Sequence, residues 1–72
     1  MPYRTLASLP AAIRNHLPAH AQRIYRSAFN NAWHEYADRR NRETLAHKVA
    51  WAAVKKRYVK YRGEWISRAR RP

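Results

Sequence analysis

The sequence of 72 residues contains no cysteine, only one glycine and only four acidic residues. Without cysteine, neither a disulfide framework nor a cysteine-ligated zinc site can stabilise the fold. A single glycine argues against an all-β protein, which would need several tight turns. No apolar run approaches the roughly 18 residues of a membrane-spanning helix, and the amino terminus does not look like a signal peptide. These absences predict one small, mainly helical, cytoplasmic domain that is neither secreted nor transmembrane.

The periodic spacing of apolar residues predicts three helices, over residues 9–17, 18–38 and 42–60. Apolar side chains recur at steps of three and four along the second helix, and the third helix carries two adjacent apolar stripes. At this length a chain buries only roughly 60% of the surface that it exposes when unfolded, so its few large side chains must fill the core. We expect the following residues in that core: Ile24, Phe29, Trp33, Tyr36, Val49, Trp51, Val54 and Tyr58.

Gly63 follows the third helix and is a plausible left-handed residue in the turn that leaves it. Residues 64–67 then have the composition of a strand, but four residues cannot form a sheet alone. Residues 3–5 are the other extended candidate, so the pattern predicts a small antiparallel sheet that joins the two termini. The single domain is expected to span residues 1–67, followed by a basic tail at 68–72.

Several blocks of the sequence closely resemble the ChaB family, from residue 1 to about residue 58: Met1-Pro2-Tyr3, Leu17-Pro18-x-His20-Ala21-Gln22-x-Ile24-Tyr25, Ala28-Phe29-Asn30-x-Ala32-Trp33 and Ala46-His47-Lys48-Val49-Ala50-Trp51-Ala52-Ala53-Val54-Lys55. The resemblance implies three helices and a small antiparallel sheet, in an arrangement likened to the cyclin box. The family name means cation transport regulator and rests on an association with a sodium/calcium–proton antiporter, whereas viral relatives are linked to DNA. The family type is acidic before and after the third helix, and this chain is basic in both places.

The positive charge is concentrated in the second half of the chain. The net charge is +12; residues 39–72 contribute +10, from twelve basic and two acidic residues, and residues 1–38 contribute +2. Such an excess favours a polyanionic partner, with nucleic acid ahead of an anionic membrane. The third helix lacks bulky exposed apolar residues for insertion, which argues against binding to a membrane.

We therefore expect the chain to bind nucleic acid, DNA more readily than RNA, through phosphate contacts with little sequence preference, because no base-reading motif is visible. The expected phosphate-binding residues lie on the connector before the third helix, along that helix and after it: Arg39, Arg40, Arg42, Lys48, Lys55, Lys56, Lys60, Arg62, Arg68, Arg70 and Arg71. The alternative is a protein-interaction module that docks an acidic partner, such as a cytoplasmic loop of a cation/proton antiporter.

Catalysis and metal binding have little support in the sequence. His16 and His20 have metal-ligand spacing, but Pro18 between them should interrupt the helix. His47 is best explained as a core histidine with a hydrogen bond. Calcium needs about six to eight oxygen ligands, and the few carboxylates near the connector are surrounded by arginines: Glu35, Asp38 and Glu43. We expect no enzymatic activity, no metal and no cofactor.

Overall fold

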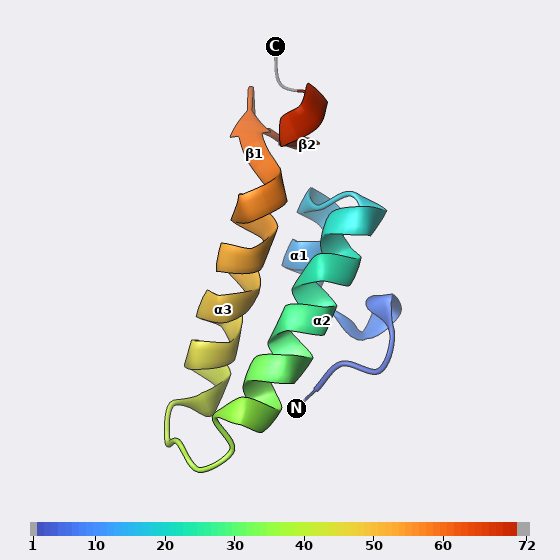
Figure 1. Ribbon diagram of the computed structural model, residues 1–72. Helices are drawn as coiled ribbons and strands as arrows, with labels where there is room; N and C mark the ends of the chain where they lie inside the picture. Colours follow the sequence, from blue (N-terminus) through green and yellow to red (C-terminus); the bar gives the residue numbers. More distant parts are fainter. Residues whose placement is uncertain (1, 71–72) are drawn as a thin grey trace.

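The computed structural model describes residues 2–70, which form three α-helices and one β-hairpin in a body of 42 × 21 × 16 Å (Figure 1). In chain order the elements are a 3-10 turn η1 (Leu6–Ser8), α1 (Ala11–His16), α2 (Ala19–Glu35), α3 (Arg42–Arg57), β1 (Tyr58–Tyr61), β2 (Glu64–Ser67) and a last 3-10 turn η2 (Arg68–Arg70). The prediction of a mainly α fold with a small two-stranded antiparallel sheet is confirmed.

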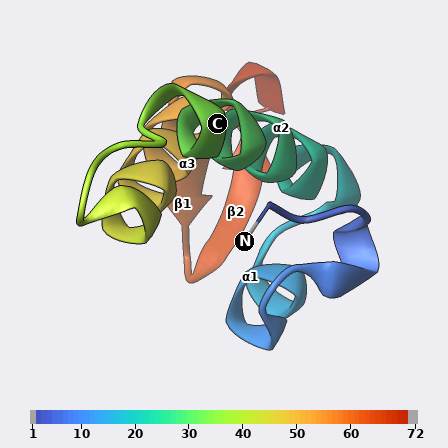
Figure 2. The ribbon, with the colours of Figure 1, turned by 90° about the horizontal axis from the view of Figure 1, so that it is seen from below.

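Helices α2 and α3 lie side by side and form the body of the molecule (Figures 1 and 2). Each presents a stripe of buried residues to the other, mostly at steps of four, as the 3.6-residue period requires. The stripes consist of Ala21, Tyr25, Phe29 and Ala32 from α2, and Ala46, Ala50 and Val54 from α3. The alanines let the two backbones approach closely, and the aromatic rings fill the space between them.

The amino-terminal segment packs on α2 rather than joining the sheet. The side-chain amide of Asn30 accepts a hydrogen bond from the Tyr3 N–H and donates one to the Tyr3 carbonyl, both at 2.8 Å. Arg26 donates to the Tyr3 and Arg4 carbonyls. The Tyr3 backbone and the Arg4 carbonyl are therefore bonded by α2 side chains, and the Thr5 backbone bonds to Ser8. The predicted pairing of residues 3–5 with 64–67 is wrong, because β2 pairs with β1 instead.

The sheet is instead a hairpin that continues directly from α3. Strand β1 pairs antiparallel with β2, in a register that sets Tyr58 opposite Ser67 and Tyr61 opposite Glu64. The two-residue turn has positive φ at both positions, 51° at Arg62 and 83° at Gly63. Such turns match the twist of a hairpin. Gly63 thus occupies the left-handed conformation that the sequence predicts.

The predicted helices are each too long. The third ends at Arg57 instead of residue 60, because β1 begins at Tyr58. The second ends at Glu35 instead of residue 38. Tyr36 still packs against the core, and the side chains of residues 37–40 are exposed. The first spans Ala11–His16, with Pro10 and Leu17 as its flanking caps.

Most of the predicted core residues pack in or against the core. Phe29, Val54 and Tyr58 are buried, and the half-buried members packed against them are Ile24, Trp33, Tyr36 and Trp51. The prediction for Val49 is wrong, because this side chain is 36% exposed. Val49 precedes the buried Ala50 and is therefore turned about 100° away from the stripe that faces α2.

Candidate interaction surface

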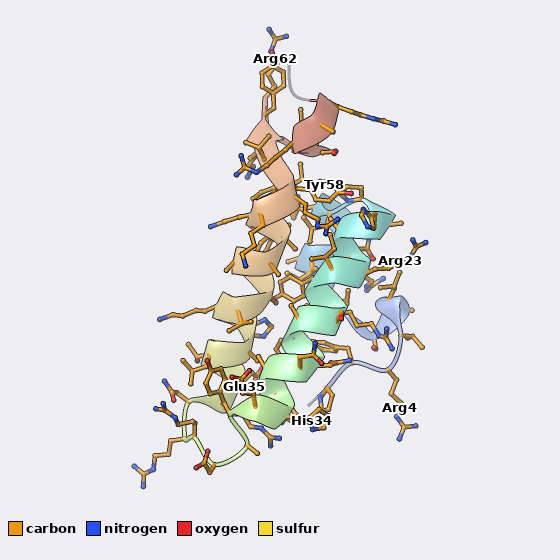
Figure 3. The ribbon with its side chains drawn as sticks, viewed as in Figure 1. Arg4, Arg23, His34, Glu35, Tyr58 and Arg62 are labelled. Atoms are coloured by element: carbon orange, nitrogen blue, oxygen red, sulfur yellow. The ribbon has the colours of Figure 1, made fainter. Side chains whose placement is uncertain are left out.

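Helix α3 is covered on one side only. It packs on α2, and the ribbon shows no other described element on the side that faces away from α2 (Figures 1 and 2). We call this side the outer face of α3 and define it by its exposed residues: Thr44, Lys48, Val49, Ala52, Lys55 and Lys56. Long side chains with nitrogen tips project from α3 on this side (Figure 3).

The outer face is cationic and partly apolar. Lys48, Lys55 and Lys56 are exposed, and Val49 and Ala52 lie among them. Within residues 2–70, the ion pairs closer than 4.0 Å include none that involves a lysine. The lysine charges of this face are therefore available to a partner.

A shallow groove runs along one flank of the outer face, lined by Thr44, His47, Lys48, Trp51, Ala52 and Lys55. Trp51 is half-buried and forms the apolar wall of the groove. Its ring packs edge-on against Tyr25, with the centroids 5.3 Å apart, and lies 5.6 Å from the ring of Trp65 in β2. Contacts with both α2 and the hairpin therefore hold this wall in place.

His47 connects the groove to the interior. Its Nδ1 shares a hydrogen bond with the hydroxyl of Tyr25, and its Nε2 lies 3.8 Å from Glu43 Oε1. Tyr25 is fully buried. Burial, with a smaller contribution from Tyr3, raises the pKa of Tyr25 to about 12. The Tyr25 hydroxyl thus stays protonated and orients the imidazole. The sequence predicts this hydrogen bond, but His47 is half-buried rather than a core residue.

The structure separates the residues that the sequence groups as one phosphate-binding surface. Arg39 and Arg40 lie in the connector, whereas Lys60 and Arg62 lie in the hairpin, at the opposite ends of α3. A helix of this length separates these ends by about 24 Å. Arg71 lies outside the described residues.

Two of these arginines are used within the protein. Arg42 Nε donates to the Trp33 carbonyl at 2.6 Å, and its guanidinium lies 3.9 Å from the centroid of the Trp33 ring. Arg68 Nε donates to the Lys55 carbonyl at 2.9 Å. Sequence reasoning missed this structural role, because it treated the arginines of the connector and of the basic tail as free surface charges.

Histidine and acidic side chains of residues 2–70 form no group of three that could hold a metal ion. His20 Nδ1 lies 3.0 Å from the Tyr58 hydroxyl and makes a hydrogen bond that links α2 to β1. None of the described helices is both long enough and apolar enough to cross a membrane.

The family model for ChaB matches residues 9–68. The chain belongs to the ChaB family. A ChaB relative from Escherichia coli K12, described as a putative cation transport regulator, is 52% identical over 66 aligned positions, which cover 83% of this chain and 87% of the relative. An uncharacterised 10.9 kDa protein of Lymantria dispar multicapsid nuclear polyhedrosis virus is 36% identical and is matched over 64% of its length.

The fold agrees with this assignment. The solution structure of a putative cation transport regulator ChaB superposes on the chain with a TM-score of 0.82 at 49% identity, and covers 93% of this chain and 99% of the other. The resemblance in the sequence is thereby confirmed.

The prediction of nucleic-acid binding through phosphate contacts is wrong. The curated ChaB relatives are described as regulators of cation transport, and nothing in these descriptions or in the family match points to nucleic acid. The findings favour the alternative reading, in which the partner is a protein. Charge excess alone misled the prediction, because it shows that anions are attracted without showing which kind of anion is bound.

Proposed function

We propose that this chain is a protein-interaction module that regulates cation transport by docking an acidic segment of its partner on the outer face of α3. The described function of its ChaB relatives supplies the link to cation transport. A cation/proton antiporter is the partner that fits best, through an acidic segment on its cytoplasmic side.

The observation that carries the proposal is the outer face itself. It combines exposed lysines with exposed apolar side chains. The one carboxylate of α3, that of Glu43, lies in the first turn of the helix beside His47. Protein interfaces place apolar contacts at the centre and charged groups around them. Complementary charge then speeds the encounter and excludes wrong partners.

The test compares charge reversals on two sides of the molecule. One variant carries Lys48→Glu and Lys55→Glu on the outer face. The matched control carries Arg4→Glu and Arg23→Glu, which change the net charge equally. These arginines lie on the side of α2 away from α3 (Figure 3). Each variant replaces the wild type in cells that lack the native gene, and cation–proton exchange is measured in everted membrane vesicles.

We expect the wild type and the control to restore the cation–proton exchange that deletion alters, and the outer-face variant to fail although it folds normally by circular dichroism. If the outer-face variant restores exchange as well as the wild type does, docking on this face is refuted. If deletion leaves exchange unchanged, the regulatory role itself is refuted.

A further inference from the structure

The groove on α3 has a spacing that selects one kind of acidic segment. Lys48 and Lys55 are seven residues apart on one continuous helix. They are separated by about 10.5 Å along the axis and by only about 20° around it, since each residue adds about 1.5 Å and 100°. The two lysine side chains therefore leave the helix at two points along a single line.

The surface between these two lysines is apolar. Trp51 forms the wall and Ala52, whose side chain is a single methyl group, lies beside it. A small residue at this place allows the backbone of a partner to approach, as in packed helices whose axes are about 8–10 Å apart. An apolar side chain from the partner can then lie against the indole.

The alternative geometry, an extended peptide, fits this spacing poorly. Side chains on one face of a strand repeat every two residues, so they are separated by about 6.6 Å or about 13 Å. Neither value matches the rise of about 10.5 Å along the helix axis from the Lys48 backbone to the Lys55 backbone. A helix that lies along α3 repeats the same rise and presents carboxylates seven residues apart on one face.

We propose that the groove binds an amphipathic helix of the partner protein that carries two carboxylates at positions i and i+7, with an apolar side chain at i+3 or i+4 between them. The carboxylates contact Lys48 and Lys55, and the apolar side chain packs on Trp51 and Ala52. This inference rests on the proposed function and specifies the partner segment that the outer face recognises.

The experiment uses two synthetic helical peptides of about 20 residues, long enough to be helical in water. One carries two glutamates seven residues apart with a leucine between them. The other has the same composition, with the glutamates five residues apart, which turns one of them about 140° away from the other. Binding of labelled peptide to the full chain is measured by fluorescence anisotropy at low salt.

We expect the first peptide to bind about three- to fivefold more tightly, the usual effect of one exposed ion pair. Lys55→Gln should abolish this preference, and Arg23→Gln should preserve it. Equal affinities for the two peptides, or no binding of the first, would overturn the inference. The proposed function would still stand if the peptide test failed but the outer-face charge reversals altered cation exchange. If those charge reversals had no effect on exchange, the proposed function would fail whatever the peptides did.

Discussion

Tyr25→Phe tests the contact that joins the core to the groove. The substitution removes only the hydroxyl that bonds His47 Nδ1, and it preserves the ring that packs against Phe29 and Trp51. A hydrogen bond of this kind contributes about 1 kcal/mol, and up to about 3 kcal/mol if its partner is left unpaired in the interior. We expect a loss of about 1–2 kcal/mol at neutral pH, because His47 is half-exposed and can still reach water.

For a domain of this size, 1 kcal/mol corresponds to a fall in Tm of about 4–8 °C. Thermal unfolding followed by circular dichroism would measure the change. The matched control is Tyr36→Phe. Tyr36 is half-buried, and the tyrosine hydroxyls that bond to side chains within residues 2–70 are those of Tyr25 and Tyr58. The control should shift Tm by a degree or two at most.

The same variant has a second signature at alkaline pH. The pKa of Tyr25 is raised to about 12 from its ordinary value of 10.0, so the folded state holds this proton more tightly than the unfolded state. The resulting stability is complete below pH 10 and is lost as the pH rises through 12. Its size is about 3 kcal/mol, from about 1.4 kcal/mol for each unit by which the pKa is raised.

Phenylalanine cannot ionise, so the difference in unfolding free energy between wild type and Tyr25→Phe should shrink as the pH rises from 10 to 12. Urea unfolding of both proteins at a series of pH values would measure this difference in unfolding free energy. The other titrating groups are the same in both proteins, so their contributions largely cancel. The assigned role of the hydroxyl would be contradicted if Tyr25→Phe were as stable as the wild type at neutral pH and at every pH up to 12.

Three further substitutions probe single features of the fold. Gly63→Ala places a Cβ where no atom lies within 4 Å, at φ of +83°. It should therefore cost only the left-handed strain, about 1 kcal/mol in urea unfolding, and an unchanged midpoint would argue against the turn. Arg42→Gln should cost about 1–2 kcal/mol through its lost contacts with Trp33, while Arg40→Gln should be neutral within about 0.5 kcal/mol. Trp51→Ala should cost about 2–3 kcal/mol, below the 3–5 kcal/mol of a fully buried aromatic, and a larger loss would show that the ring is not half-exposed in solution.

The helical body could be predicted from the sequence because its signal is local. Buried residues repeat at helical intervals along α2: Ala21, Tyr25, Phe29 and Ala32. The buried alanines of α3 repeat in the same way. The hairpin could not be placed in the same way. Tyr58 continues the apolar spacing of α3, so the pattern predicts that the helix continues through it. The backbone instead changes to β conformation at this residue.

One signal could have located the hairpin. The segments before and after Arg62 and Gly63 are rich in aromatic and β-branched residues, and a two-residue loop between such segments is typical of a hairpin. Arginine is an unusual first residue for this turn, where asparagine or aspartate is common. The signal was therefore weak.

The exposed lysines of the candidate surface could be predicted from the sequence, but the kind of partner that they bind could not. Lys48 and Lys55 stand out by charge and spacing in the sequence. The internal role of Arg42 depends on the Trp33 carbonyl, nine residues earlier in the chain, which only the folded backbone brings close. The positive charge of this chain does not show whether the anionic partner of the lysines is a nucleic acid or a protein.

The alanines between α2 and α3 have a consequence for how this family can diversify. Ala21, Ala32, Ala46 and Ala50 are at most 1% exposed, so methyl groups act as spacers that fix the distance between the two helices. A larger side chain at any of them would push the helices apart, and overpacking costs about 1–3 kcal/mol. Substitutions on the outer face of α3 leave these spacers untouched. The domain can therefore acquire a new surface charge, and with it a new partner, without any change in its internal dimensions.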